Sequence, residues 1–425
     1  MIFKEAMRSL KHDKSRAFFY WLTLMLTTTF MYLYFNIAMD ESIGMSLGES
    51  SDNIITIITL ISVLICCADI FFANDYYVKN KSKDLAVRLV SGATYVHIAG
   101  YLLIQTSLLM LLAIPSGILI ARFLMTPLNM IVASVLPGGT HIIEPVPRGE
   151  LYTYVILAFI VCWIVVMNLS FTYLNSAASL INQRNASKGE KGSMFYLKSI
   201  PNWMRQIFWL FMFLAPVYTF YANRDSIVLF ACIGMVGFNG ILRWIIRPFI
   251  TRMISAGKSE PKRIAYLGFI REDLQVMKFA MYLLLVSVII MASILVTNQS
   301  NPMVKVMITM SYIFLSVLQA MALMFRYSTE LSERKRHFAS LSRIGYTMKQ
   351  LKSITRKEVF GYYGSVLLIS MIYLINIYIS LVSAGTMNTS FAIALVLIVA
   401  IPLCICAIGS LFYYRGIVLT EGAQS

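Results

Sequence analysis

Two charged runs interrupt the apolar sequence of this chain and hold its best candidates for binding a partner. Residues 79–95 read KNKSKDLAVRLVSGATY, and residues 333–348 read ERKRHFASLSRIGYTM. Each run, called elbow 1 and elbow 2 below, combines cations and apolar residues with a glycine that permits a left-handed turn. Aligning Gly92 with Gly345 also pairs Lys83 with Arg336, Leu85 with Phe338 and Ala86 with Ala339.

Elbow 1 predicts a short amphipathic helix that ends in glycine just before a membrane span. We expect its charged side chains to be solvated, namely Lys79, Lys81, Lys83 and Asp84. We expect one apolar helical stripe, marked by Leu85, Leu89 and Val96. Such a helix suits docking into a groove of a partner protein. The alternative is a solvated connector whose cations contact anionic lipid.

Residue types that catalyse reactions or bind metals are not grouped in patterns that favour either activity. The six cysteines lie inside apolar runs, as small buried residues do: Cys66, Cys67, Cys162, Cys232, Cys404 and Cys406. The four histidines are scattered, and no HExxH motif, Ser/His pair or carboxylate pair at catalytic spacing is found. We therefore expect no catalytic residue and no metal site in this chain.

The composition is that of an integral membrane protein. The chain has 425 residues, of which 58% are hydrophobic and 13% charged, and its mean hydropathy is +0.72. Apolar runs of about 20 residues predict spanning α-helices rather than the alternating strands of a barrel. No cleavable signal opens the chain, so the first run is expected to be retained. The fold class predicted is all-α and polytopic.

Ten apolar spans are predicted, and the basic residues orient them. The spans are 17–38, 53–77, 98–121, 151–175, 204–221, 226–249, 278–297, 303–326, 359–382 and 390–413. With both termini in the cytoplasm, all but four of the 36 basic residues lie inside; the four are Arg122, Arg148, Arg224 and Lys305. This asymmetry follows the positive-inside rule. It also explains the net charge of +16 without nucleic acid as a partner.

Several segments between and within the spans carry their own expectations. Residues 1–14 and 264–278 predict interfacial helices, each leading into a span. Residues 182–199 are polar and contain glycine, which indicates a linker. The apolar stretch 123–136 contains Pro127 and is too short to span, so we expect it at the outer interface or re-entering. The fifth span is short and interrupted by Pro216.

The order of these parts indicates an internal duplication. One copy, 1–175, holds an interfacial helix, four spans and elbow 1, and the second copy, 264–425, repeats that order with elbow 2. A two-span bridge with cytoplasmic linkers, 176–263, joins them. Because six spans separate equivalent ones, the copies are parallel repeats related by an axis along the membrane normal.

Three polar residues within the spans are candidates for an intramembrane site. Asp69 lies in span two, toward the predicted cytoplasmic end, where an ionisable group is costly and often functional. Its alternative role is pairing near the interface or contact with water. Asn168 and Gln319 favour hydrogen bonds between helices over a ligand site.

The two elbows resemble the coupling-helix motif of FtsX/MacB-type (type VII) ABC transporter permeases. KSKDLAVRLVSGAT and RKRHFASLSRIGYT follow its form, a basic and an acidic residue, an apolar and a small one, then Gly-small-hydroxyl. Elbow 1 fits through Lys81, Asp84, Leu85, Ala86, Gly92, Ala93 and Thr94. Elbow 2 departs from it, since His337 replaces the acidic residue and Tyr346 follows the glycine.

Ten spans in two copies resemble the bacitracin-resistance (Bce-type) branch of that family. The resemblance implies two copies of a separate cytoplasmic ABC ATPase as partners, often a sensor histidine kinase, and resistance to peptide antibiotics at the bacterial plasma membrane. ATP and Mg²⁺ would be bound by the ATPase and no cofactor by this chain, which lacks GxxxxGK[ST]. The branch carries a large extracellular domain between spans seven and eight, where this chain has only TNQSNP.

The function expected is therefore an ABC permease subunit that acts on an amphipathic peptide antibiotic or a lipid-linked client and is not itself an enzyme. The alternatives are a non-transporting scaffold or sensor that relays ATPase state to a signalling partner, and an ion-driven transporter using Asp69. Membrane lipids are further expected partners. The candidate coupling residues are Lys81, Lys83, Asp84, Leu85, Ala86, Arg88, Gly92 and Ala93 in elbow 1, and Arg334, Arg336, Phe338, Ala339, Arg343 and Gly345 in elbow 2.

Overall fold

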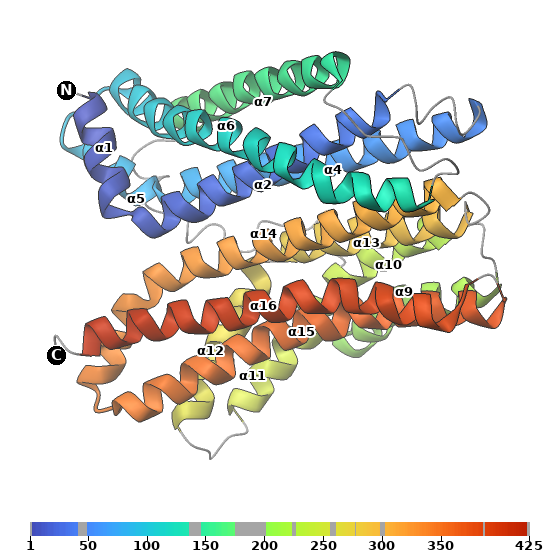
Figure 1. Ribbon diagram of the computed structural model, residues 1–425. Helices are drawn as coiled ribbons and strands as arrows, with labels where there is room; N and C mark the ends of the chain where they lie inside the picture. The colour runs from blue at the N-terminus through green and yellow to red at the C-terminus, as the bar shows by residue number, and fades with distance from the viewer. Residues whose placement is uncertain are drawn as a thin grey trace. The chain divides into compact units, whose positions relative to one another are not determined.

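The computed structural model of the chain is built from helices and divides into two compact units (Figure 1). It describes residues 2–40, 49–135, 146–174, 201–222, 227–255, 261–276, 278–297, 302–385 and 387–422. Unit 1 comprises Met1–Lys198 with Asn301–Met307, and unit 2 comprises Ser199–Ser300 with Ile308–Ser425. Every element assigned within the described ranges is helical. The two helices of the predicted bridge belong to unit 2.

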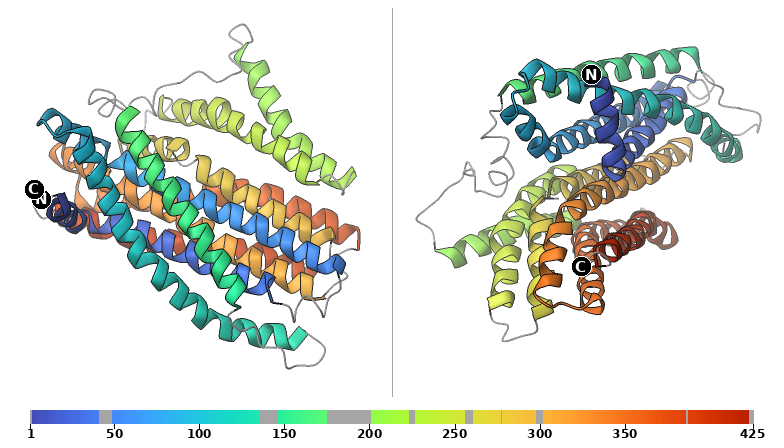
Figure 2. Two further views of the ribbon diagram at one scale, coloured as in Figure 1. Left: turned by 90° about the horizontal axis from the view of Figure 1, so that it is seen from above. Right: turned by 90° about the vertical axis from the view of Figure 1, so that its left-hand side faces the viewer.

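Unit 1 is a helical bundle in which α2 occupies the centre. Its helices are α1 (Ile2–His12), α2 (Lys14–Ala38), α4 (Glu49–Asn80), α5 (Ser82–Val90), α6 (Tyr95–Val135) and α7 (Pro147–Leu174). The short α1 crosses one end of the bundle (Figure 2). Along α2, the hydroxyls of Thr27, Thr28 and Thr29 donate to carbonyls of the preceding turn. Bonding within the helix satisfies these buried hydroxyls.

Close approach of α2 and α6 depends on Gly117. A Cβ at this position would lie 2.7 Å from the Met25 carbonyl oxygen and 2.9 Å from Cβ of Thr28. The glycine lets the two backbones meet, and Thr29 donates a hydrogen bond to the Gly117 carbonyl at 3.0 Å. Small residues serve helix packing in membranes in the same way.

Unit 2 contains the remaining helices. They are α9 (Asn202–Ala222), α10 (Ile227–Ile241), the π-helical turn η2 (Leu242–Ile246), α11 (Arg247–Ser255), α12 (Pro261–Val276), α13 (Lys278–Thr297), α14 (Pro302–Arg343, of which the first six residues fall in unit 1), α15 (Met348–Ser383) and α16 (Thr389–Gly422). Within unit 2, α9 and α10 lie side by side (Figure 2), since a Cβ at Gly237 would meet backbone atoms of Met212 and Phe213.

Aromatic and hydroxyl contacts hold α14, α15 and α16 together. Tyr327 of α14 stacks on Tyr362 of α15 with ring centroids 5.2 Å apart. The hydroxyls of Tyr363 and Ser410 hydrogen-bond at 2.8 Å, which joins α15 to α16. Tyr327 and Tyr362 lie at similar chain distances from Gly345, so α14 and α15 form an antiparallel hairpin around elbow 2.

Within the described ranges, eight helices are long and apolar enough to cross a membrane by length and composition. They cover Arg16–Ala38, Ile55–Asn80, Tyr95–Met130, Pro147–Tyr173, Ile233–Ser255, Val304–Ser328, Met348–Ser383 and Thr389–Tyr414. The chain is therefore a polytopic α-helical membrane protein, as the composition predicts. The two further predicted spans, 204–221 and 278–297, fall within α9 and α13.

Helices α6 and α9 both continue through proline. Residues 123–135 belong to α6, which runs through Pro115 and Pro127 as one helix of 41 residues. They are therefore not a separate re-entrant segment, and their place at the outer interface stays a prediction. Pro216 does not interrupt α9, which runs for 21 residues. Membrane helices tolerate proline because side chains and neighbouring helices can satisfy the freed carbonyls. The predicted linker 182–199 lies outside the described residues.

Candidate functional site

Elbow 1 ends in a glycine turn of defined geometry. Gly92 has a φ of 96°, a left-handed conformation that disfavours side chains. The Ala93 amide donates to the Arg88 carbonyl at 3.0 Å, and the Gly92 amide donates to the Leu89 carbonyl at 3.1 Å. These two bonds form a Schellman motif, which satisfies the last carbonyls of α5. Thr94 then accepts the His97 amide at 3.3 Å and caps α6.

Elbow 2 repeats this construction residue by residue. Gly345 has a φ of 101°, and the Tyr346 and Gly345 amides donate to the Leu341 and Ser342 carbonyls at 3.1 and 2.9 Å. Thr347 caps α15 in a capping box with Gln350. The sequence Gly-x-Thr thus ends one helix and starts the next in both elbows. Unlike α5, however, elbow 2 is the end of the long helix α14 rather than a separate helix.

The two faces of α5 have different surroundings. Leu85 and Ala86 are fully buried, whereas Val87 and Val90 are 69% and 73% exposed. Val96, at the start of α6, is 68% exposed. We call Val87, Val90 and Val96 the valine patch. The predicted stripe of Leu85, Leu89 and Val96 is wrong, because Leu85 faces the bundle and the glycine turn separates Val96 from α5.

An ion pair fastens α5 to the crossing helix α1. Arg88 donates from Nη1 to Oε2 of Glu5 at 2.7 Å, and His97 Nε2 lies 3.7 Å from the same oxygen. The hydrogen bond from Arg88 lowers the pKa of Glu5 below its ordinary value. The Arg88 guanidinium also lies 4.1 Å from the centroid of the Tyr101 ring, a cation–π contact. Arg88 is therefore an internal brace rather than a free docking cation.

Lys81 is buried, and the prediction that it is solvated is wrong. Its side chain has no exposed surface, and Nζ donates to Oγ of Ser9 at 3.0 Å. Asp13 Oδ2 lies 3.7 Å away, and the Tyr77 ring centroid lies 5.3 Å away. Burial disfavours the charged amine and lowers the pKa of Lys81 to about 8, although Asp13 opposes this shift. Lys81 thus joins elbow 1 to α1 from inside the unit.

The other predicted residues of elbow 1 are placed as follows. Asp84 and Ala93 are exposed and half-buried, respectively. Lys79 forms an ion pair with Asp75 one turn before it, at 2.6 Å. The side chains of Lys83, and of Arg334 and Arg336 in elbow 2, lie outside the described part of the structure.

In elbow 2, aromatic packing replaces the ion pair found in elbow 1. Phe338 is 3% exposed and contacts Phe269 of α12 and Tyr414 of α16, with ring centroids 5.9 and 5.4 Å away. Ala339 is half-buried and Arg343 exposed. Ile344, just before the glycine, is 75% exposed. The aligned pair Leu85 and Phe338 is therefore buried in both units, whereas the exposed apolar side chains sit at different positions.

A groove of about 400 Å³ lies between α12 and the end of α14. Phe269, His337, Ser340 and Leu341 form part of its wall. An added Cβ at Gly268 would meet no atom within 4 Å, so the groove is open above this glycine. Elbow 2 therefore presents a recess beside α12, whereas in elbow 1 the Glu5–Arg88 contact joins α1 to α5.

Asn168 belongs to a buried polar chain that crosses all four long helices of unit 1. The Tyr20 hydroxyl donates to Asn74 at 3.1 Å, and Asn74 donates to Asn168 at 3.0 Å. Asn168 in turn donates to the Thr106 hydroxyl at 3.2 Å. The sequence analysis missed Tyr20, Asn74 and Thr106. Asn74 could have indicated this polar chain from the sequence, because it is a polar residue within a predicted span.

The remaining intramembrane candidates are buried. Asp69 is 5% exposed and Gln319 fully buried. Among the described residues, no group of three or more His, Cys, Asp and Glu side chains is arranged to hold a metal ion.

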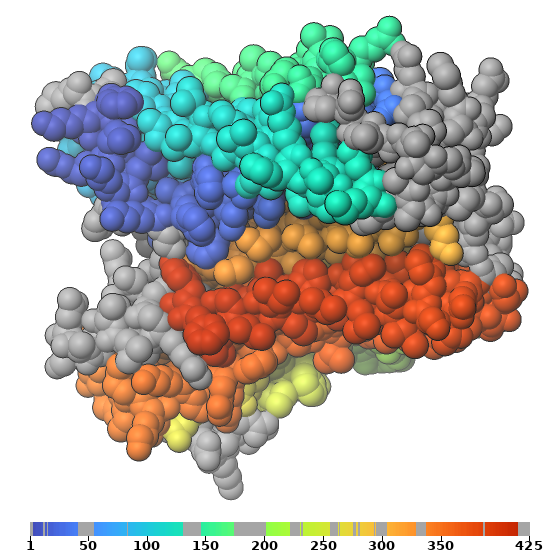
Figure 3. Space-filling view, viewed as in Figure 1, coloured from blue at the N-terminus to red at the C-terminus, as the bar shows by residue number. Residues whose placement is uncertain are grey.

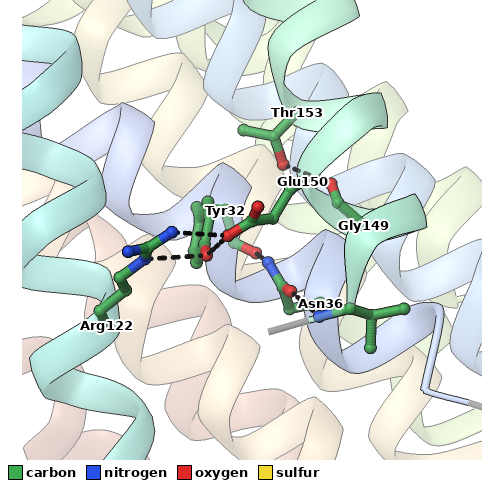
Figure 4. Close-up of polar contacts among 7 residues, drawn as sticks. Tyr32, Asn36, Arg122, Gly149, Glu150 and Thr153 are labelled. Atoms are coloured by element: carbon green, nitrogen blue, oxygen red, sulfur yellow. Dashed lines mark hydrogen bonds and ion pairs between the residues drawn. The ribbon is translucent and has the colours of Figure 1, made fainter. Parts of the chain in front are cut away.

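A second polar cluster, also missed from the sequence, joins α2, α6 and α7 (Figure 4). The Tyr32 hydroxyl donates to Glu150, and Arg122 donates to the same carboxylate oxygen at 2.9 Å. Asn36, one turn after Tyr32, accepts the Val146 amide at 2.9 Å. The sequence signal for this cluster was a single arginine, Arg122, and a single glutamate, Glu150, each at the end of an apolar run. This cluster pins the start of α7 to the end of α2 that lies far from α1.

Comparison with known proteins adds no relative: neither a scan against models of protein families nor a search of curated proteins gives a match.

Proposed function

We propose that this chain is the permease subunit of an ABC transporter, driven by two copies of a separate cytoplasmic ATPase. Its client would be an amphipathic peptide antibiotic or a lipid-linked molecule, which the complex exports, removes or resists. The observation that carries the proposal is the repeated elbow. Two stretches 253 residues apart share a Schellman turn at a left-handed glycine and a threonine cap on the next helix.

The elbows carry exposed apolar side chains suited to a protein partner. In elbow 1, Val87 and Val90 of the valine patch lie on α5, whose opposite face is buried. In elbow 2, Ile344 is exposed and follows Leu341, a residue of the groove wall, by three positions. Exposed aliphatic side chains next to cations suit docking to a protein surface better than solvation by water alone.

Helix length supports the same assignment for elbow 2. The 42 residues of α14 extend about 63 Å at roughly 1.5 Å per residue. A bilayer core is about 30 Å thick. The apolar part ends at Ser328, so the rest of α14 extends beyond the core and carries elbow 2 toward the aqueous phase. In the proposed orientation this aqueous phase is the cytoplasm, and both termini also lie in the cytoplasm.

In the proposed mechanism the partner's closure on ATP displaces the elbows as levers. Because Glu5 and Ser9 bind Arg88 and Lys81, displacement of elbow 1 would move α1 together with α4 and α6. Displacement of elbow 2 would move α14 and α15, which are joined by stacked tyrosines. The full proposal includes ten spans, with α9 and α13 as the fifth and seventh, and two parallel four-span modules.

The test is purification of the chain from its native membrane followed by identification of bound proteins. We expect a P-loop ATPase at two copies per permease. Changing Val87 and Val90 together to Asp should reduce its recovery at least tenfold, because carboxylates would be buried in the interface. Lys79→Gln is the control, because it breaks only the exposed ion pair with Asp75 at the end of α4. Normal folding with no ATPase recovered in any preparation would refute the proposal.

One observation favours a second role as a scaffold or sensor that relays ATPase state to a signalling partner such as a histidine kinase. Only four residues separate α13 from α14, where the Bce-type branch has its extracellular domain. This role predicts that signalling persists in variants that no longer move or remove the client. Loss of both activities in every elbow variant would remove the support for it.

A further inference from the structure

Far from elbow 2, the last turns of α15 and the first turns of α16 enclose a groove of about 440 Å³. Ile375, Tyr378, Ile379 and Val382 follow helical spacing along α15, and α16 contributes the facing wall. The α16 wall comprises Thr389, Ala392, Ile393, Val396 and Leu397, and Ser383 ends the α15 wall. Figure 3 shows α16 as an uncovered ridge on one face of the molecule.

The groove is lined almost entirely by hydrocarbon. Tyr378 is 2% exposed and its hydroxyl donates to Tyr312 at 2.9 Å, so the phenol oxygen is satisfied within unit 2. Ser383 donates to the Ser380 carbonyl at 2.8 Å. Ile379 and Ile393 remain 52% and 57% exposed at its rim. A polar ligand would find few unsatisfied partners along these walls.

The residues that line the groove carry no charge, which further limits the class of ligand that the groove can bind. Residues 359–414, which include both walls and the connection between them, contain no Asp, Glu, Lys or Arg. Phosphate and pyrophosphate groups are typically held by Arg and Lys. Residues 359–414 therefore offer no cation to a phosphate group, whereas a hydrocarbon chain needs none.

The dimensions of the groove fit one hydrocarbon chain. From Ile375 to Val382 the α15 wall extends about 10 Å along the helix at roughly 1.5 Å per residue, a fraction of one leaflet. The volume lies near the lower end of the range of about 300–1,000 Å³ for small-molecule sites. The small side chain of Ala392, 6% exposed, leaves room at the groove floor.

We propose that this groove binds one acyl chain of a membrane phospholipid, with Ser383 and Thr389 at the headgroup end. The bound chain fills the space between α15 and α16. This inference does not depend on the ATPase proposal. Because α15 also starts at elbow 2, the bound lipid contacts the same continuous helix that carries that elbow.

The experiment uses the full chain in nanodiscs of phosphatidylcholine that carries a photoreactive diazirine on one acyl chain. After illumination, labelled residues are mapped by mass spectrometry. We expect label on residues 375–397 severalfold above that at Leu368 and Ile405, which are exposed on the same helices outside the groove. Equal labelling at all these positions would indicate ordinary bilayer contact and overturn the proposal.

Two variants that fill the groove keep the test decisive. Ala392→Phe fills the floor and Ile393→Trp covers the rim, and each should reduce groove labelling severalfold. Leu368→Phe is the matched control and should leave it unchanged. Unaltered labelling in a folded groove variant would contradict the proposal. So would displacement of the label by a polyprenyl phosphate but not by unlabelled phosphatidylcholine, since that result assigns the groove to a different ligand.

Discussion

At the scale of single residues, the chemistry of elbow 1 is concentrated in contacts with α1. Glu5 binds Arg88, and Ser9 accepts a hydrogen bond from Lys81. The Glu5 carboxylate is favoured by its cation partners, so this brace persists until the pH falls through the lowered pKa of Glu5. Burial disfavours the charged form of Lys81 and lowers its pKa too, so both groups make the fold more stable as the pH rises, Glu5 in the acidic range and Lys81 in the basic range.

The buried amine gives a prediction about stability against pH. The pKa of Lys81 is about 8 in the fold and 10.5 in the unfolded chain. Between these values the unfolded chain binds more protons, so stability should rise as the pH increases from about 8 toward 10.5. Thermal unfolding of Lys81→Met should show a smaller rise than that of the wild type.

Lys79→Met is the control for this prediction, because Lys79 is half-exposed and pairs with Asp75 at the surface. It should retain the wild-type pH dependence. The same dependence in Lys81→Met and the wild type would show that Lys81 is not buried as described.

At the scale of elements, the turn glycines and the close-packed glycines have different constraints. No atom lies within 4 Å of a Cβ added at Gly92 or Gly345, so only the backbone conformation demands glycine there. At Gly117 the conformation is helical, and backbone atoms of α2 occupy the space of a Cβ.

Substitution at Gly92 should therefore follow backbone preference rather than size. Gly92→Val should weaken the turn by about 1–3 kcal/mol, the range for residues held in unfavourable backbone regions. Gly92→Asn should be milder, since Asn tolerates the left-handed region best after glycine. Hydrogen exchange of the Ala93 amide measures the effect. Equal exchange in both variants would contradict this account.

Substitution at Gly117 should instead follow size. Gly117→Ala places a methyl group 2.7 Å from the Met25 carbonyl oxygen, and overpacking of this kind costs about 1–3 kcal/mol. Unfolding in mixed micelles measures the loss. Gly364→Ala is the control, because Gly364 is helical with open space around its Cβ, and it should be neutral or stabilising.

At the scale of the whole molecule, the structure establishes a polytopic helical protein with eight helices of spanning length and composition in its described part. Units 1 and 2 each contain an elbow, a helix that packs beside it and a long helix that follows the turn. Chemical labelling from either side of the membrane can test the proposed orientation of these helices.

The proposed topology gives a prediction for single cysteines placed on a cysteine-free background. Cysteines at Ser187 and Ser342 should react with an impermeant thiol reagent only from the cytoplasmic side. Cysteines at Ser46 and Ser300 should react only from outside. The reverse pattern would invert the orientation, and a mixed pattern would reject the ten-span arrangement.

The sequence alone determined the helical class, the apolar segments and the turn glycines. These features depend on local properties: the length of an apolar run and the steric freedom of glycine. The caps made by the threonines after both glycines were not predicted, although a hydroxyl that reaches an amide three residues on is also a local contact. The continuity of α6 and α9 through proline was not readable from the same local rules, because membrane helices tolerate proline where other groups can bond the freed carbonyls.

Only the tertiary structure decided which face of each elbow is available. The sequence predicts Lys81 as a solvated cation and Arg88 as a coupling residue, yet side chains of α1 more than 65 residues earlier bind both. The valine patch is exposed because Leu85 and Ala86 face the bundle. Burial depends on contacts between segments distant in the chain, and periodicity within one short helix does not specify which neighbours cover it.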